Sequence, residues 1–286
     1  MLAAGVLCIG FSAIFVRLAG VPGAVSGFYR LAISSVVLII PMFLHWRRGR
    51  VHLPRRAAIW ALLAGLALAG DMALWNTALI ITDVSIATLL DNLAPIWVGL
   101  VMWLFLRQRP AGLYWLGLAV AIAGVVIILG VDVVLGLGAD RGSLLALAAG
   151  GTYAAYQLFA KRARAEIDTL SYFWVFTTTG ALILYLLARL LGNPLTGYPV
   201  SSYLALAGLA LFTHTLGWLL ISYAYGYLSA TSVAVAALGQ PVITTLAAMP
   251  ILGEIPDAEH IIGGVIALAG ILIAQRGILT APTPDP

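Results

Sequence analysis

Charge is what this chain lacks most. Only 9% of its 286 residues are charged, 62% are hydrophobic, and the mean hydropathy is +1.05. A soluble globular protein carries about 25% charged residues, so this sequence has too few of them to cover a water-facing surface. The composition therefore excludes a compact soluble enzyme.

Cysteine and the common catalytic motifs are scarce as well. Cys8 is the single cysteine and lies in an apolar run, which excludes a disulfide framework and a thiolate metal site. The sequence has no His-Glu-x-x-His and no phosphate-binding Gly-x4-Gly-Lys-Ser/Thr, and Gly10-Phe11-Ser12 lacks the closing glycine of a nucleophile elbow. Without a nucleotide-binding loop, the chain cannot hydrolyse ATP itself.

The apolar residues instead form runs near 20 residues long. Each run is long enough to cross a hydrocarbon core about 30 Å thick as a helix. The runs do not show the alternating pattern of barrel strands, so a β-barrel is rejected. Windows of about 19 residues predict ten spans: 2–19, 25–45, 58–80, 84–106, 111–131, 142–161, 169–191, 200–226, 229–252 and 259–276.

Basic residues set the predicted orientation, because short loops rich in Lys and Arg stay in the cytoplasm. With the N-terminus inside, eleven of the fifteen basic residues fall in inner segments, including the cluster from Arg47 to Arg56 and the cluster from Lys161 to Arg164. Nine or eleven spans would put one cluster on the wrong side. The pattern predicts ten spans with both termini in the cytoplasm.

An internal repeat appears when residues 78–124 are laid on 224–270, a shift of 146 residues. The matched pairs are Ala78 with Ala224, Pro95 with Pro241, Leu106 with Leu252, Pro110 with Pro256, Gly117 with Gly263, Ala121 with Ala267, and Gly124 with Gly270. Five helices per repeat is an odd number, so the second copy enters the membrane from the opposite face. Such inverted repeats are typical of secondary transporters that bind substrate near the midplane.

These positions resemble the EamA repeat of the drug/metabolite transporter superfamily. The pattern is Ala-x4-(Asp/Ser)-x-(Ser/Thr), a proline about ten residues later, and Gly-x6-Gly after a short turn. It occurs at Ala78, Asp83, Ser85, Pro95, Gly117 and Gly124, and again at Ala224, Ser229, Thr231, Pro241, Gly263 and Gly270.

Arg30 resembles the arginine usual in that family, and so does Gly253-Glu254 before the second turn; Arg107-Gln108 in the first copy departs from the pattern. Within the superfamily, the aromatic-rich spans are most similar to the aromatic amino acid and paraquat exporters of the YddG type. The resemblance implies a ten-helix exporter with a central cavity and alternating access.

Strongly polar side chains within spans are costly in a bilayer and should face the bundle interior. The candidates are Asp71, Asn76, Asp91, Asn92, Gln157, His214 and Gln240. Asp71 and Asp91 lie on adjacent spans and are candidates for ion coupling, with Arg17 and Arg30 as expected partners. The alternative is that each is a neutral or Arg-paired structural aspartate. Glu254, Asp257, Glu259 and His260 are interpreted as a solvated outer loop.

Aromatic side chains accompany these polar groups at helical spacing. Tyr153 and Gln157 are four residues apart, as are His214 and Trp218, and Tyr156 is adjacent to Gln157. An indole face suits an aromatic solute or cation, and an imidazole offers a donor or acceptor. The alternatives are an interfacial belt and a core histidine. The expected substrate-binding residues are Trp75, Asn76, Trp97, Tyr153, Tyr156, Gln157, His214, Trp218 and Gln240.

Pro95 and Pro241 are expected in mid-helix, where a proline frees a carbonyl one turn earlier. Their repetition indicates gating, although a packing kink explains either proline alone. The Gly117, Ala121 and Gly124 stripe and its counterpart at Gly263, Ala267 and Gly270 indicate close helix packing.

The sequence thus predicts an all-α polytopic membrane protein with ten transmembrane helices in two inverted five-helix repeats. The expected divisions are residues 1–131, 142–276 and a cytoplasmic tail at 277–286. We expect a bacterial inner-membrane exporter of small amphipathic metabolites, chiefly aromatic amino acids. We expect a monomer in the bilayer whose partner is a small-molecule substrate, with no cofactor, no metal and no nucleic acid. The alternatives are an intramembrane enzyme using Asp71 and Asp91, or a passive channel or facilitator.

Overall fold

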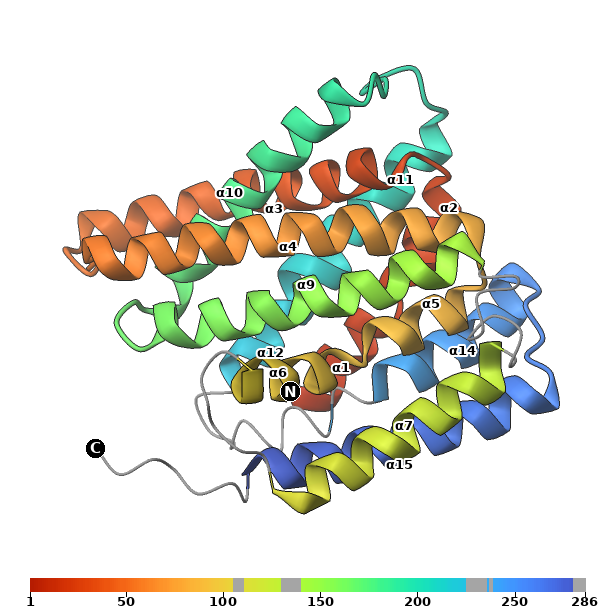
Figure 1. The fold of residues 1–286 in the computed structure, drawn as a ribbon. Helices are drawn as coiled ribbons and strands as arrows, with labels where there is room; N and C mark the ends of the chain where they lie inside the picture. Colours follow the sequence, from red (N-terminus) through yellow and green to blue (C-terminus); the bar gives the residue numbers. More distant parts are fainter. Residues whose placement is uncertain (105–110, 130–139, 225–235, 237–238, 280–286) are drawn as a thin grey trace.

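A computed structural model describes residues 1–104, 111–129, 140–224, 236 and 239–279 of the chain. Every element in these ranges is a helix (Figure 1). The helices are α1 (Leu2–Gly10), α2 (Ser12–Ala19), α3 (Gly23–Arg47), α4 (Arg55–Ile81), α5 (Val84–Asp91), α6 (Ala94–Leu104), α7 (Gly112–Leu129), α9 (Arg141–Arg164), α10 (Thr169–Leu190), α11 (Val200–Gly208), the π-helix η1 (Leu209–Gly217), α12 (Trp218–Ala224), α14 (Gly239–Leu252) and α15 (Ala258–Leu279).

Large apolar side chains cover much of the outside of this bundle. Val36, Leu182, Leu190 and Val200 are each at least 60% exposed, which a protein in water would avoid over so wide an area. Five described helical segments are long and apolar enough to cross a membrane: Leu2–Ala19, Gly23–Arg47, Arg55–Ile81, Thr169–Leu190 and Val200–Ile221. Three shorter apolar segments lie in α7, α14 and α15. A polytopic membrane protein is therefore supported, while the number ten stays a prediction.

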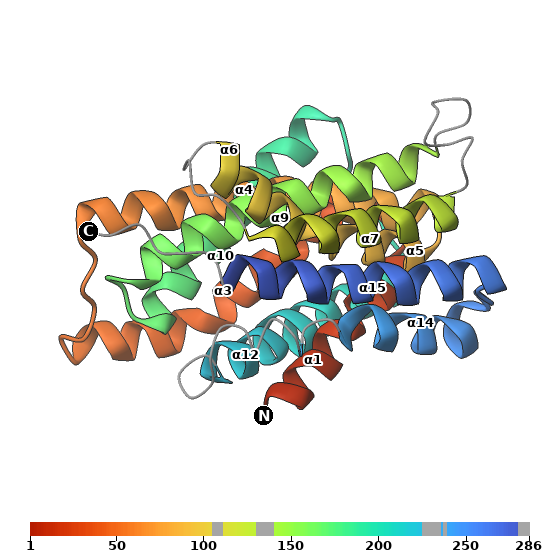
Figure 2. The same cartoon turned by 60° about the horizontal axis from the view of Figure 1, so that its bottom comes forward.

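Helices of the two sequence repeats are interleaved in the bundle. In Figure 1, α4 and α9 run side by side across the middle, and α10 packs against both α3 and α4. At the opposite edge, α7 and α15 lie along each other in both views (Figures 1 and 2). Much of the core is therefore built between the repeats.

The shift of 146 residues also relates the observed helix starts. It carries Gly23, where α3 begins, onto Thr169, where α10 begins. It likewise carries Gly112 at the start of α7 onto Ala258 at the start of α15. The repeat found in the sequence is therefore a repeat of helices.

The α7–α15 contact depends on small residues, as the glycine stripes predict. A Cβ atom added at Gly117 would collide with the backbone of Ala274, and one added at Gly270 with the backbone of Ala121. A Cβ atom at Gly124 would meet the backbone of Ala267 in the same way. The packing interpretation of these stripes is confirmed.

Three predicted spans differ from continuous α-helices. The span 2–19 is interrupted at Phe11, and the span 84–106 is interrupted at Asn92 and Leu93. The span 200–226 contains the π-helix η1 in its middle. In the predicted span 229–252, the structure describes Ala236 and the helix Gly239–Leu252, and the other residues of that span lie outside the described ones.

One of the two predicted gating prolines is consequently not in mid-helix, because Pro95 is the second residue of α6. Pro241 lies in α14, and the residues just before the described part of that helix lie outside the described ones, so its mid-helix position stays a prediction. A proline is tolerated in the first turn because its missing N–H has no intrahelical partner there. Pro41 and Pro250 instead lie inside α3 and α14.

Candidate functional site

Four buried polar side chains from four helices meet inside the bundle: Arg30 of α3, Asp71 of α4, Asp91 of α5 and His214 of η1. We call them the Arg30 cluster. Each side chain is at most 9% exposed. Arg30 Nε donates a hydrogen bond to His214 Nδ1 over 3.3 Å. The carboxyl groups of Asp71 and Asp91 lie within hydrogen-bonding reach of each other, and both interact electrostatically with Arg30.

The accepting role of Nδ1 defines the state of the imidazole. Arg30 has donors only, so His214 must offer an unprotonated Nδ1 to this bond and carry its proton on Nε2. Nε2 is buried and has no hydrogen-bond partner in the described part of the chain. The cluster therefore contains a buried N–H donor, His214 Nε2, to which no described group offers an acceptor.

A helix break positions Asp91 in this cluster. Asp91 is the last residue of α5, and Pro95 supplies no N–H to the Asp91 carbonyl four residues earlier. Helix α9 approaches this break closely at Gly150, where an added Cβ atom would lie 2.9 Å from the Asp91 oxygen and 3.2 Å from the Leu90 oxygen. The missing side chain at Gly150 thus lets α9 pack directly against the interrupted backbone.

A second irregularity positions His214. The π-helix η1 is wound more loosely than an α-helix, and such segments often occur at functional sites. Thr213 and Thr215 donate their hydroxyl groups to the backbone oxygens of Leu209 and Ala210 inside it. Thr215 also shares a 2.7 Å hydrogen bond with Ser34 of α3, which holds η1 beside the helix that carries Arg30.

Aromatic rings surround His214 on the side of the second repeat. The His214 ring centroid lies 5.4 Å from that of Phe173, 6.4 Å from that of Phe176 and 6.0 Å from that of Trp218. Tyr156 contacts Trp218 at 5.8 Å and stacks on Tyr153 at the same distance. Tyr153 interacts electrostatically with Arg30. We call these six rings of α9, α10, η1 and α12 the aromatic wall: Tyr153, Tyr156, Phe173, Phe176, His214 and Trp218.

The structure thus joins six predicted residues around Arg30, namely Asp71, Asp91, Tyr153, Tyr156, His214 and Trp218. Phe173 and Phe176 were missed because phenylalanine is common in an apolar span and does not stand out there. Of the two arginines expected to pair with the aspartates, Arg30 does so. Arg17 does not, because it donates hydrogen bonds to the backbone oxygens of Leu79 and Thr82 at the end of α4.

The remaining predicted residues have other surroundings. Asn76 is fully buried and donates a 3.2 Å hydrogen bond to the backbone oxygen of Gly23, which ties α4 to the start of α3. Trp97 lies half-buried against Gly151 of α9. Gln157 of α9 and Gln240 of α14 are half-buried, and Trp75 is buried.

Several other buried polar atoms also lack a partner among the described residues. They include Asp71 Oδ1, Asp91 Oδ1, Trp75 Nε1 and Trp97 Nε1. Buried polar atoms are hydrogen-bonded in the great majority of cases. Two of these atoms, Asp71 Oδ1 and Asp91 Oδ1, belong to the Arg30 cluster itself, which is therefore a region that would bind a polar solute or water.

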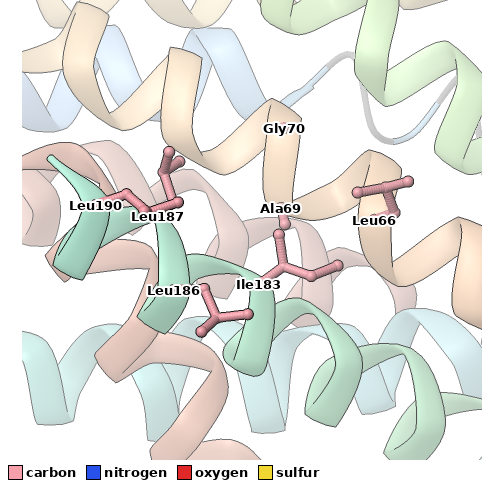
Figure 3. A pocket seen from close by; sticks show the side chains of 7 residues that line it. All are labelled: Leu66, Ala69, Gly70, Ile183, Leu186, Leu187 and Leu190. Atoms are coloured by element: carbon pink, nitrogen blue, oxygen red, sulfur yellow. The ribbon is translucent and has the colours of Figure 1, made fainter.

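Two surface grooves lie elsewhere, one between α4 and α10 and the other where these helices meet the start of α3. One holds about 290 Å³ and is lined by the apolar residues shown in Figure 3: Leu66, Ala69, Gly70, Ile183, Leu186, Leu187 and Leu190. Leu66, Leu186 and Leu190 are exposed on the outside of the bundle. This groove has no charged or hydrogen-bonding side chain with which to select a polar substrate, so we do not assign the functional site to it.

The chain matches the EamA-like transporter family twice, over residues 1–130 and 140–275. An uncharacterized transporter of Archaeoglobus fulgidus is 28% identical over 86% of this chain and 85% of its own length. A probable terminal-alkyne amino-acid exporter of Streptantibioticus cattleyicolor is 27% identical over 94% of this chain and 89% of its own.

The threonine/homoserine exporter RhtA of Salmonella typhimurium is 32% identical over 52% of this chain and 46% of its own length. A solved crystal structure of a protein with 20% identity superposes with a TM-score of 0.66 and covers 96% of this chain and 95% of that chain. This last likeness concerns the fold alone.

Proposed function

Because the chain belongs to the EamA-like transporter family, we propose that it exports small amphipathic metabolites, aromatic amino acids foremost, by secondary-active alternating access. The observation that carries the proposal is the Arg30 cluster facing the aromatic wall. Relatives named as an amino-acid exporter and as a threonine/homoserine exporter support an amino acid as the transported solute.

The two sides of the site suit the two ends of such a solute. Arg30, Asp71 and Asp91 belong to the first repeat, whereas the aromatic wall belongs entirely to the second. A guanidinium binds a carboxylate through paired donors, and a carboxylate binds an ammonium group. The indole and phenol faces would receive the side chain. In this proposal Trp75, Trp97, Gln157 and Gln240 also contact the solute during the cycle, and Asn76 supports the site by holding α4 against the start of α3.

The carboxyl pair supports coupling to protons. Two carboxyl groups in hydrogen-bonding reach can hold one proton between them, and Arg30 is the cation that balances the remaining charge. We propose that Asp71 and Asp91 exchange this proton during the cycle. The sequence has no ATP-binding loop that could supply the energy instead.

The membrane arrangement belongs to the same proposal. We assign ten spans in an inner membrane, with both termini in the cytoplasm and repeat units at 1–131 and 142–276. Pro95 follows the interruption between α5 and α6, and Pro241 is its counterpart in the second repeat; we propose that these two places act as hinges. The matching starts of α3 with α10 and of α7 with α15 support this inverted arrangement.

Flux into proteoliposomes tests the assignment. Phenylalanine, tryptophan and threonine would be compared with phenethylamine, which keeps the ring and the amine but lacks the carboxylate. We expect aromatic amino acids to be carried at least about tenfold faster than the amine, because a desolvated charged pair is worth about 1.5–3 kcal/mol. Equal flux of amino acid and amine would overturn the role of Arg30.

Two variants test the site residues. His214→Ala and Gln240→Ala should lower flux without lowering folded yield, and Leu190→Ala, a change at an outward-facing side chain that is 85% exposed, should not. Wild-type flux in both site variants would show that the assignment of His214 and Gln240 to the substrate site is wrong. Flux that does not change when a pH gradient is imposed would remove proton coupling and favour the facilitator.

The intramembrane enzyme is the second candidate, and one observation favours it. An acid/base pair needs both carboxyl groups within hydrogen-bonding reach, and Asp71 with Asp91 meets that requirement. The relatives are nevertheless named transporters and exporters, so we place the pair in transport. Chemical conversion of a solute by the purified protein would reverse that choice.

A further inference from the structure

Glu254 links the two repeats at one end of the bundle. Its Oε2 atom accepts a 3.1 Å hydrogen bond from the backbone N–H of Val84, which is 170 residues away in the sequence. Val84 is the first residue of α5 in the first repeat, and Glu254 follows α14 of the second. Interpreting Glu254 as part of a solvated loop is therefore wrong.

The end of α14 directs Glu254 to this place. Helix α14 ends at Leu252, and Gly253 adopts a left-handed conformation with a φ of +73° while its amide bonds to Met249. A left-handed glycine is a common helix terminator because it has no Cβ atom to clash. The chain turns there, and the Glu254 side chain reaches the start of α5.

Helix α5 has no cap of its own at this position. Asp83 precedes it, but the Asp83 side chain makes no capping hydrogen bond. The first N–H groups of a helix have no intrahelical partner and carry partial positive charge. A carboxylate from the other repeat thus takes the part that an N-cap side chain usually has.

A second acidic residue of the second repeat contacts the same connection. Asp140 caps α9 by accepting from the amides of Gly142 and Ser143, and its side chain also bonds to Thr82. Burial alone would raise the pKa of Asp140, but these hydrogen bonds lower it overall. The residues 82–84 between α4 and α5 are therefore held from the second repeat by two acids.

The residue that corresponds to Glu254 in the first repeat carries no charge. The shift of 146 residues carries Glu254 onto Gln108 and Val84 onto Ala230, and both counterparts lie outside the described residues. In an inverted arrangement, this counterpart pair belongs to the other side of the membrane. The repeat thus pairs a carboxylate in its second copy with a neutral amide in its first.

We propose that Glu254 stabilises the transporter state in which the α5/α14 end is closed, and that its contact with Val84 breaks whenever this end opens. The inference rests on the proposed alternating access, and the predicted orientation puts this end on the outer side. Charge-assisted hydrogen bonds are about twice as strong as neutral ones. Losing the contact should raise the ratio of open to closed molecules at least about tenfold.

Spin labels beside the contact measure that ratio without any substrate. In a Cys8→Ala background, Ile81→Cys and Ile255→Cys introduce labelling sites at side chains that are 49% and 86% exposed. Electron paramagnetic resonance of the full chain in nanodiscs then gives the distribution of distances across the α5/α14 end. We expect a dominant short distance in this parent protein.

Val84→Pro removes only the donor and tests the hydrogen bond itself. A proline suits the first position of a helix, and the ψ of 135° at Asp83 is one that the residue before a proline adopts. Val84→Ala is the matched control because it keeps the N–H and shortens the same buried side chain. We expect longer distances in Val84→Pro and the parent distribution in Val84→Ala.

Glu254→Ala tests the acceptor and covers the case in which Val84→Pro fails to fold. Its control is Glu259→Ala, which removes an exposed carboxylate near the same end. The proposal expects Glu254→Ala to lengthen the distance, Glu254→Gln to lengthen it less, and Glu259→Ala to leave it unchanged. Equal distributions in Glu254→Ala and Glu259→Ala would overturn it.

The experiment separates this inference from the proposed substrate. If Glu254→Ala lengthens the distance but the protein transports no amino acid, the role of Glu254 is supported and the proposed substrate is wrong. If the protein transports amino acids but Glu254→Ala leaves the distances unchanged, the proposed substrate is supported and the role of Glu254 is refuted.

Discussion

Replacing Gly270 by alanine tests the packing of α7 against α15 most directly. A Cβ atom there would collide with the N and Cα atoms of Ala121. These are backbone atoms and cannot rotate away, so we expect the upper part of the usual overpacking penalty, about 3 kcal/mol. Alanine also gains about 0.5–1 kcal/mol over glycine within a helix. The net expected loss is about 2 kcal/mol.

Gly264→Ala is the matched control in the same helix. The nearest atom to its added Cβ would be Leu89 Cδ2 at 3.9 Å, an ordinary van der Waals distance. This variant should therefore gain the helix preference of about 0.5–1 kcal/mol. Each variant adds one methyl group to the same helix, yet their free energies of unfolding should differ by about 3 kcal/mol.

Thermal unfolding of detergent-solubilised protein, followed by tryptophan fluorescence, measures this difference. At about 2–4 °C per kcal/mol for a chain above 150 residues, the two midpoints should differ by roughly 6–12 °C. Gel filtration before heating would verify that both variants begin folded. Equal midpoints for Gly270→Ala and Gly264→Ala would refute the close approach of α7 and α15.

The other predictions concern helix ends. Asp168 accepts hydrogen bonds from the amides of Leu170 and Ser171 at the start of α10, and its Oδ1 atom lies 3.3 Å from His45 Nε2. Asp168→Ala should therefore lower the free energy of unfolding by about 1 kcal/mol. Asp168→Asn keeps the cap and loses only the charge. Burial alone would raise the pKa of Asp168, but the hydrogen bonds from Ser171 and the nearby His45 lower it overall. The greater stability of wild type over Asp168→Asn in thermal unfolding should therefore hold at neutral pH and fade below about pH 4. Arg17→Gln should lose about 1–3 kcal/mol because Arg17 bonds to the end of α4, while the exposed Arg189→Gln should leave the unfolding midpoint unchanged.

The sequence predicted the regular parts of this fold well because they depend on local composition. Apolar runs located α3, α4 and α10 within a few residues of their observed ends. The interruptions at Phe11 and Asn92 and the π-helix around His214 were missed. A break or a looser turn leaves the hydropathy of a span unchanged, since the same apolar residues still face the bilayer. It depends instead on which backbone and side-chain groups the neighbouring helices supply.

The candidate site was predictable where a polar side chain stood out against an apolar background. Asp71, Asp91 and His214 were found in this way, and the structure brings them to Arg30. Glu254 was misread because its partner is a backbone N–H, which no residue type reveals, in a helix 170 residues away. Phe173 and Phe176 were missed because phenylalanine is ordinary in a membrane span.

The symmetry of the fold does not extend to its chemistry. The shift of 146 residues carries Arg30 onto Phe176, Asp71 onto Gly217 and Asp91 onto Ala237, so each charged group of the cluster has an uncharged counterpart. His214 likewise corresponds to Leu68. Equivalent charged residues in both repeats would suit a solute charged at both ends, such as a dicarboxylate. In the proposed function, the charged residues of the first repeat face the aromatic wall of the second, and this arrangement suits a solute that is polar at one end and apolar at the other.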